Sequence, residues 1–254
     1  MKLRVESVVH GGETLARHEG RVVFLRGAAP GDVVEAELIG EGRFERARAL
    51  RVVERGAARV EAPCPIVDLC GGCPVQQISY EAQLAAKEEL AADALERIGG
   101  FARGSYELLP IVRSPKQFQY RRRARMHRVA GRWGFAGPEG ATPVDECLLF
   151  EPLLQQLADA VRGVDLPGAT DLGLLAGDSK GAVDLRGNVK RADKLLALRL
   201  VKGVTLSGQV LGDPVIADSP LSNGARLRAR PDTFAQANRE AVPLLQQEVL
   251  RALG

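Results

Sequence analysis

Three of the four cysteines lie close together, in the run Cys64-Pro-Ile-Val-Asp-Leu-Cys70-Gly-Gly-Cys73, and the fourth, Cys147, lies much further along the chain. Thiolates are soft ligands that bind iron–sulfur clusters and zinc. The two glycines before Cys73 allow the backbone to fold tightly around a bulky inorganic group. Three close thiolates and one remote thiolate are typical of a 4Fe–4S cluster, so the spacing predicts Cys64, Cys70, Cys73 and Cys147 as its ligands.

Two other interpretations of the cysteines remain open. Zinc commonly takes its thiolates as two C-x2-4-C pairs, and unligated structural or redox thiols would need no metal at all. Four reduced thiols without a signal peptide predict a cytoplasmic protein, because disulfides are rare in that compartment. The sequence also contains no apolar run long enough to span a membrane.

A basic stretch between Glu107 and Glu139 is the second candidate for chemistry. It contains no acidic residue, and its cations are Arg113, Lys116, Arg121, Arg122, Arg123, Arg125, Arg128 and Arg132. Four aromatic residues are interleaved with them: Phe118, Tyr120, Trp133 and Phe135. Arginines neutralise phosphates and aromatic rings stack on unpaired bases, so the stretch predicts RNA binding. A strand with a core-facing aromatic row and solvated arginines is the alternative.

The elements that must position these residues begin with a β-rich segment over residues 1–55. The 254 residues carry a net charge of +3 and suggest one to two domains. Short strands are predicted at Val22–Leu25, Val33–Leu38 and Arg46–Val53, and the last slips in phase at Ala49-Leu50, as a β-bulge would. Several short strands separated by glycine turns favour a small closed barrel of the OB type.

The remainder alternates between helices and strands. Ser79 is placed to cap a helix that ends at Gly99-Gly100, with Tyr80, Leu84, Ala91, Leu95 and Ile98 on its buried face. A second helix is predicted from Pro152 to Val161 and a third from Arg239 to Leu253. Strands are predicted at Asp171–Gly177, Val183–Arg186, Lys194–Val201 and Val204–Leu211.

The first segment resembles a known module. The run from His10 to Phe24, His-Gly-Gly-Glu-Thr-Leu-Ala-Arg-His-Glu-Gly-Arg-Val-Val-Phe, followed by Ala29-Pro-Gly-Asp-Val-Val, is similar to a TRAM domain. That resemblance implies an OB-like RNA-binding barrel at the front of an RNA-modifying enzyme.

The cysteine run extends the resemblance. C-x5-C-G-G-C followed by glutamine, Tyr80, Gln83 and Lys87 is similar to the cluster region of the TRAM-containing RNA uracil-C5 methyltransferases, and Tyr120-Arg-Arg-Arg-Ala-Arg-Met resembles their tyrosine–arginine strand. Phe234-x-Gln236-x-Asn238 before a helix is similar to the start of their catalytic domain. The resemblance implies that Cys147 completes a cluster, that Gln236 contacts S-adenosylmethionine, and that Phe234 lies near ribosomal or transfer RNA.

The family's Pro-Pro-Arg nucleophile motif and D-x-G-x-G loop do not occur in this sequence. The expected fold is therefore mainly β with α: a TRAM barrel (1–55), an iron–sulfur segment with a linker helix (56–100), a central β-rich α+β domain carrying Cys147 (101–230), and the truncated start of a Rossmann-like domain (231–254). No catalytic residue is predicted.

The expected function is the RNA-recognition and 4Fe–4S portion of an RNA uracil-C5 methyltransferase, monomeric and inactive alone. A separate catalytic domain is an expected partner besides the RNA. A stand-alone RNA-binding iron–sulfur protein is the alternative, and a small redox carrier is a third possibility.

Overall fold

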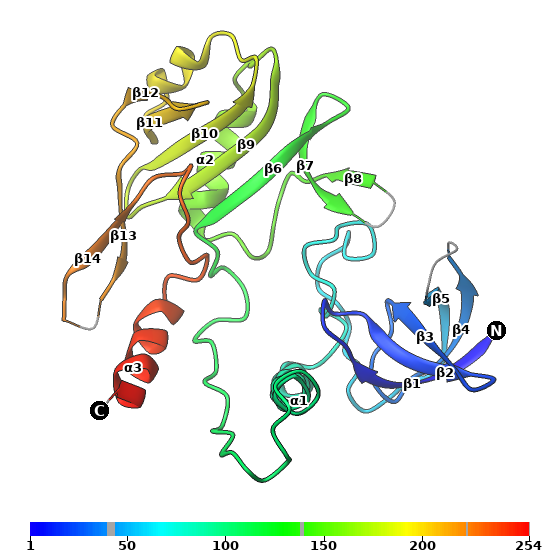
Figure 1. Ribbon diagram of the computed structural model, residues 1–254. Coiled ribbons are helices and arrows are strands. Elements are labelled where there is room, and N and C mark those ends of the chain that lie inside the picture. The colour runs from blue at the N-terminus through cyan, green and yellow to red at the C-terminus, as the bar shows by residue number, and fades with distance from the viewer. Residues whose placement is uncertain (40–43, 138–139, 222, 254) are drawn as a thin grey trace. The chain divides into compact units, whose positions relative to one another are not determined.

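The computed structural model describes residues 1–39, 44–137, 140–221 and 223–253 (Figure 1). The chain divides into two compact units, Met1–Arg113 and Ser114–Gly254. The first unit holds the predicted barrel together with the cysteine run and its helix. The second unit holds the predicted central domain together with residues 231–253, so these last residues continue the second unit.

A closed five-stranded barrel opens the first unit. Its strands are β1 (Lys2–Val8), β2 (Thr14–His18), β3 (Arg21–Arg26), β4 (Val33–Leu38) and β5 (Glu45–Glu54). They close in the order β1-β2-β3-β5-β4, and this part of the fold prediction is confirmed. In the β4–β5 ladder, Glu35 pairs with Arg51 and Ala36 with Ala49. Leu50 is therefore the extra residue, at the position where the sequence alternation slips.

Alternating apolar side chains fill the barrel. Each strand points every second residue inward, because successive Cβ atoms of a strand lie on opposite faces. The fully buried members include Leu3, Val5, Val23, Leu25, Val34, Ala36 and Ala47. The outward-facing positions of β3 and β5 carry arginines instead, and Arg46 lies over the ring of Phe24 at 5.8 Å from its centroid.

A buried aspartate ties the barrel to the segment that carries the cysteines. The Asp32 carboxylate accepts from the backbone N–H of Ala29 (2.7 Å) and of Gly56 (2.8 Å). It also accepts from Arg59 Nε (2.8 Å), and the Arg59 side chain is only 12% exposed. Gln77 adds a second link, because its Nε2 donates to Ala28 O at 3.0 Å. Residues on both sides of the cysteine run are thus bonded to the barrel.

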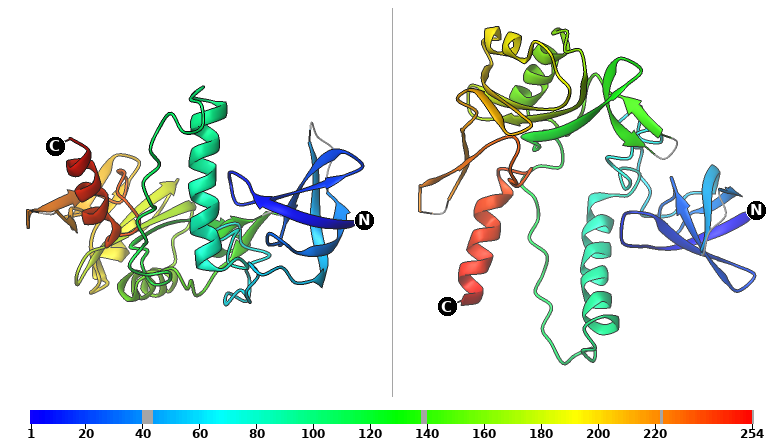
Figure 2. Two further views of the ribbon diagram at one scale, coloured as in Figure 1. Left: turned by 90° about the horizontal axis from the view of Figure 1, so that it is seen from below. Right: turned by 45° about the horizontal axis from the view of Figure 1, so that its top comes forward.

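Helix α1 (Tyr80–Arg97) follows the cysteine run. Ser79 is its N-cap, and its side chain accepts from Ala82 N at 3.3 Å, as predicted. The predicted apolar face is only partly correct: Leu84 is buried as predicted, but Ala91 is exposed and Ile98 is 85% exposed. Ala92, which was not predicted, is buried instead. The chain then runs back along the helix in an extended segment (Figure 2), where Ile111 N donates to Glu88 Oε1 at 2.7 Å.

The second unit is built on a seven-stranded sheet in the order β12-β11-β10-β9-β6-β7-β8. Its strands are β6 (Arg123–Val129), β7 (Arg132–Gly137), β8 (Gly140–Pro143), β9 (Ala169–Ala176), β10 (Gly181–Gly187), β11 (Val201–Leu206) and β12 (Gln209–Gly212). Every neighbouring pair is antiparallel except β10 with β11. A parallel pair needs a crossover, which here carries the 3-10 helix η1 (Ala192–Ala197).

Helix α2 (Pro152–Arg162) packs against strands β9 and β10 on one face of this sheet. It is amphipathic, and its buried residues Leu154, Leu157, Ala158 and Val161 form one stripe. The paired sheet residues Leu172–Met126 and Leu174–Val183 are buried as well. The residues between them, on the opposite face, are polar and form the candidate site.

The strand predictions in the second unit succeed and fail by region. The strand over residues 171–177 and the helix from Pro152 are confirmed by β9 and α2. The predicted strand Lys194–Val201 is wrong, because η1 and a loop occupy it, and the predicted strand Val204–Leu211 is a hairpin of β11 and β12. Strands β13 (Ile216–Pro220) and β14 (Arg226–Ala229) were not predicted.

Helix α3 (Ala241–Leu253) ends the described chain. Within the described residues, no helix combines the length and apolar character needed to cross a membrane.

Candidate functional site

The loop between β14 and α3 presents two of the residues singled out in the sequence. Phe234 is 82% exposed and Gln236 is exposed, whereas Ala235 between them is buried. This alternation is that of an extended segment lying on the unit with every second side chain directed outward. An aromatic ring and a carboxamide are therefore available at the surface, one residue apart.

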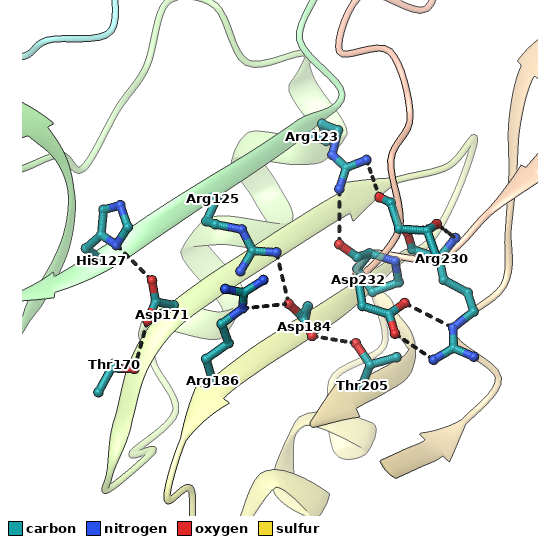
Figure 3. Close-up of polar contacts among 12 residues, drawn as sticks. Arg123, Arg125, His127, Thr170, Asp171, Asp184, Arg186, Thr205, Arg230 and Asp232 are labelled. Carbon is teal, nitrogen blue, oxygen red and sulfur yellow. Dashed lines mark hydrogen bonds and ion pairs between the residues drawn. The ribbon is translucent and has the colours of Figure 1, made fainter. Parts of the chain in front are cut away.

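Arg123, predicted to bind RNA, holds this loop in place. Its guanidinium donates to the carbonyls of Thr233 (2.7 Å), Pro231 (3.1 Å) and Ala235 (3.4 Å), contacts that lie at the right of Figure 3. A guanidinium has five N–H donors in a rigid fork, which suits it to gather several carbonyls. Arg123 thus serves the site by fixing the backbone on both sides of Phe234.

The far end of the loop is fixed by Asn238. Its Oδ1 accepts from Ala241 N at 3.2 Å, which caps helix α3, and its Nδ2 donates to Ser114 Oγ at 2.9 Å. Next to it, Arg122 N donates to Ala237 O at 3.0 Å. The sequence pattern Phe-x-Gln-x-Asn therefore has a local cause, because its asparagine sets where the helix begins.

Arg122 and Arg121 lie under this loop. Arg122 is fully buried, and its guanidinium donates to the Ala176 carbonyl. This side chain is therefore not at the surface of the unit, and RNA contact by Arg122 stays a prediction. Arg121 is partly buried and pairs through its backbone with Asn238 and Phe150. Strand register, which no local pattern states, decides which of these arginines faces inward.

Arg125, the fourth predicted RNA-binding arginine, belongs to a buried polar network. The network lies on the face of the sheet opposite α2, which we call the open face. Arg125 NH2 donates to Asp184 Oδ2 at 3.0 Å, and Thr205 Oγ1 donates to Asp184 Oδ1 at 2.8 Å (Figure 3). Asp184 is 4% exposed and Thr205 is fully buried. Gly173 lies between the two charged strands, where an added Cβ would come within 2.9 Å of Asp184 Cβ. The network crosses β6, β10 and β11 and stiffens this face.

A histidine–aspartate pair lies further along the same face. His127 Nδ1 is 2.8 Å from Asp171 Oδ1, and Thr170 Oγ1 donates to Asp171 Oδ2 at 2.8 Å. The Thr170 hydroxyl and then His127 hold the pKa of Asp171 below its usual range, against the opposing effect of partial burial. No local pattern in the sequence singles out these residues, because only the β6–β9 register brings them together.

A second ionic network lies where α3 begins. Arg239 donates to Glu151 Oε1 (3.1 Å), to Gly177 O (2.6 Å) and to Asp178 Oδ1 (2.6 Å). Burial raises the pKa of Glu151, and the nearby Arg239 charge partly offsets this effect. Arg226 and Arg239 both bond to Asp178, and the Arg226 hydrogen bond is the main cause of the lowered pKa of that carboxyl.

Most remaining cations of the basic stretch also have partners within the chain. Arg113 pairs with Glu81 at 2.8 Å, Lys116 with Glu240 at 2.5 Å, and Arg132 with Asp145. Arg128 lies over the Trp133 ring at 4.9 Å from its centroid. The sequence stretch lacks acidic residues, but the fold supplies them from elsewhere, so the number of cations overstates what is available to RNA.

The cysteine run forms a series of turns closed by its own backbone. Cys70 N donates to Ile66 O at 2.9 Å, and Cys64 N donates to Gln76 Oε1 at 3.3 Å. In the other unit, Cys147 N donates to Gln155 Oε1 at 3.2 Å. All four cysteines, including Cys73, are partly buried.

No group of three or more His, Cys, Asp or Glu side chains is arranged to hold a metal ion in the part of the chain that the structure describes. The 4Fe–4S cluster and the zinc alternative therefore find no support in this geometry.

Comparisons with known proteins agree with these features. Residues 1–41 match the TRAM domain model. An uncharacterized RNA methyltransferase of Aquifex aeolicus is 36% identical over 65% of this chain and 39% of its own length. The 23S rRNA (uracil(1939)-C(5))-methyltransferase RlmD of Pseudomonas entomophila is 30% identical over 100% of this chain and 61% of its own length. This chain belongs to the TRAM-containing RNA uracil-C5 methyltransferase family.

A solved structure shows the same fold. The Pyrococcus abyssi tRNA (uracil-54, C5)-methyltransferase, in complex with S-adenosyl-L-homocysteine, matches 98% of this chain and 64% of its own with a TM-score of 0.66 and 19% identity. This chain spans 39%, 36% and 62% of the lengths of the Aquifex aeolicus, Gloeobacter violaceus and Thermosynechococcus vestitus methyltransferases.

The matches correct the prediction that the chain ends in the truncated start of a separate Rossmann-like domain. The methyltransferase of P. entomophila aligns over 100% of this chain, so residues 231–254 belong to the part that this relative shares with it. In the structure, residues 231–253 are built into the unit that begins at Ser114. The interpretation as an inactive RNA-recognition and iron–sulfur portion, or as a stand-alone iron–sulfur protein, was therefore wrong.

Proposed function

We propose that this protein is an S-adenosylmethionine-dependent RNA (uracil-C5-)-methyltransferase that modifies ribosomal or transfer RNA. The observation that carries the proposal is the alignment, over the whole chain, with a 23S rRNA uracil-C5 methyltransferase. We assign the reaction to the Phe234–Gln236 loop of the second unit, since both side chains are exposed and Arg123 bonds the backbone carbonyls of the loop.

Gln236 is the residue of this loop that suits the cofactor. A carboxamide donates and accepts hydrogen bonds, so it can meet either the ammonium or the carboxylate of the cofactor's methionine part. S-adenosylmethionine, when bound, supplies an electrophilic methyl group to uracil C5. Gln236 orients that group, and one such hydrogen bond contributes on the order of 1 kcal/mol.

Phe234 suits an unpaired base. Its ring is 82% exposed, and a base that stacks on an aromatic ring gains about 1–3 kcal/mol. Enzymes that act on a base take it out of its helix and read it in a pocket, so a stacking residue beside the cofactor contact fits the reaction. Arg123 keeps the two side chains at a fixed separation by bonding the carbonyls on both sides of Phe234.

The barrel supplies a second RNA contact in this proposal. Its outward face carries Phe24, and Arg46 lies over that ring while Glu13 accepts from Arg46 and Arg26. Arginine and aromatic side chains on an OB-like barrel bind single strands by stacking and charge. The four cysteines as ligands of one site stay a prediction from spacing, and no step of the proposed reaction runs through them.

The test is methyl transfer from labelled S-adenosylmethionine to unmodified ribosomal and transfer RNA, with 5-methyluridine identified by mass spectrometry. Cofactor binding is measured separately by equilibrium dialysis. Gln236→Ala should weaken cofactor binding about tenfold and leave RNA affinity unchanged, while Gln236→Glu, which keeps the side-chain shape, reports whether the amide donor matters. Wild-type protein that binds RNA but forms no 5-methyluridine would overturn the proposal.

A further inference from the structure

A surface hollow lies at the end of the seven-stranded sheet where β10 and β11 begin. It is lined by Ser179, Lys180, Arg199 and Leu200. The β9–β10 turn and the segment before β11 meet there, because Gly181 N donates to Leu200 O at 2.8 Å. Lys180 and Arg199 therefore face one hollow although they lie far apart in the sequence.

The crossover that carries η1 (yellow in Figure 1) adds three more cations to this surface. The η1 surface is defined by its exposed cations, Lys180, Lys190, Arg191, Lys194 and Arg199. In a 3-10 helix, residues three apart share a face, which puts Arg191 and Lys194 together. Ala192 and Leu195 are buried and anchor the helix on the sheet. The helix packs on β11 and β12.

These cations are available, unlike those of the arginine stretch. Among the described residues, none of the five forms an ion pair or donates a side-chain hydrogen bond to a carboxylate. Asp193 is the only exposed acidic residue between Asp184 and Asp213, and Asp178 beside the hollow is already bonded to Arg226 and Arg239. The η1 surface therefore carries a net positive charge that no internal partner neutralises.

We propose that the η1 surface binds the sugar–phosphate backbone of the RNA substrate, outside the region where Phe234 and Gln236 lie. The inference rests on the proposed function for the identity of the polyanion. The surface has lysines and no aromatic residue, so it suits phosphates, which fix the position and register of a nucleic acid without reading its sequence. It would hold the RNA while the Phe234 loop engages one base.

The test compares two variants of the full chain that lose equal charge. The η1 variant carries Lys180→Gln, Lys190→Gln, Lys194→Gln and Arg199→Gln, and spares Arg191, whose φ of 63° fixes the start of η1. The control variant carries Lys87→Gln, Arg97→Gln, Arg103→Gln and Arg251→Gln, which are exposed cations on α1, the segment after it and α3. Binding of fluorescein-labelled oligouridine and of an RNA hairpin is measured by anisotropy over a range of salt concentrations.

The η1 variant should lower the slope of log K against log salt by about 3, since each lost phosphate contact removes about 0.7 for a single strand. The control variant should change the slope by less than about 1. A slope unchanged in the η1 variant, or lowered equally in both variants, would overturn the inference while leaving RNA binding established. Wild-type protein that binds neither RNA would overturn the proposed function itself, and binding only to phosphatidylserine vesicles would assign the surface to a membrane.

Discussion

Two regions of the second unit carry many cations, and the fold uses them differently. In the arginine stretch before and within β6, Arg122 is buried, Arg123 binds three backbone carbonyls and Arg125 binds Asp184. On the η1 surface, Lys180 and Arg199 lie exposed around a hollow. The first region uses its charge to hold the protein together, and the second leaves its charge for a ligand.

A local excess of basic residues in the sequence therefore does not locate a nucleic-acid interface. Buried guanidiniums need partners, because an unpaired buried charge is costly, and strands from elsewhere in the chain supply those partners. An exposed cation without a partner keeps its full attraction for a phosphate. The cations available to a ligand can therefore be identified only in the folded chain. There Asp184 pairs with Arg125 and Glu240 pairs with Lys116, although neither cation has an acidic neighbour in the sequence.

The largest expected effect comes from removing the buried carboxylate of the first region. Asp184→Ala leaves Arg125 and Thr205 without their partner and should lower the free energy of unfolding by about 3 kcal/mol, at the lower end for a buried pair because Arg125 is partly exposed. Asp193→Ala, on the η1 surface, is the matched control and should change it by less than about 0.5 kcal/mol. Urea unfolding of both variants measures this, and equal losses would erase the distinction between the regions.

The next largest effect on stability comes from removing the hydrogen bonds by which Arg123 holds the loop before α3. Arg123→Ala removes the donors to the Thr233 and Pro231 carbonyls, which should cost about 2 kcal/mol of unfolding free energy. Amide hydrogen exchange in residues 232–235 should become faster, because the loop loses the hydrogen bonds that hold it. Arg199→Ala, which removes an exposed arginine of the η1 surface, should leave both quantities unchanged. Faster exchange in the Arg199 variant alone would reverse the roles assigned here.

The sequence predicted the elements whose cause is local. The β5 bulge at Leu50, the Ser79 cap and the helix that starts at Pro152 each follow from residues near one another in the chain. The strand predicted at Lys194–Val201 failed because Leu195 to Leu198 form a continuous apolar run, which does not distinguish a strand from a short helix packed on a sheet. Tertiary packing decided between the two.

The site was less predictable than the fold. Phe234 and Gln236 could be named from a resemblance, but nothing local indicates that Arg123 binds their loop from far back in the chain. The Asp171–His127 pair depends on the β6–β9 register in the same way. Long-range register and the pairing of distant charges are set by the whole core, so a reading of neighbouring residues could not supply them.

A smaller effect is expected at Phe234, where a substitution should change RNA binding without changing the free energy of unfolding. Phe234→Ala should leave the unfolding free energy within about 0.5 kcal/mol of wild type, because the ring is 82% exposed. It should weaken binding of single-stranded RNA by about 1–2 kcal/mol, roughly tenfold, through the loss of stacking. Phe234→Tyr keeps a stacking ring and serves as the control. Anisotropy titrations that show equal affinity for all three proteins would remove Phe234 from the site.

The smallest expected effect is a pH dependence of the free energy of unfolding that comes from Asp171 on the open face of the sheet. It tests whether directed hydrogen bonds hold charges on this face, as they do in the arginine stretch. The Thr170 hydroxyl and His127 lower the pKa of Asp171 in the folded chain, so the unfolded chain binds the proton more readily. Asp171 therefore adds stability above its unfolded pKa of about 3.9, and this contribution is lost as the pH falls through the lower folded value. Because the side chain is 23% exposed, the contribution should be below about 1 kcal/mol. Thr170→Val removes the main cause and should raise the pKa of Asp171 toward its ordinary value in an NMR titration of its carboxyl carbon. The stability that Asp171 adds above its unfolded pKa then becomes smaller, and less of it is lost on acidification. An unchanged titration in that variant would show that the open face does not hold its charges by directed hydrogen bonds.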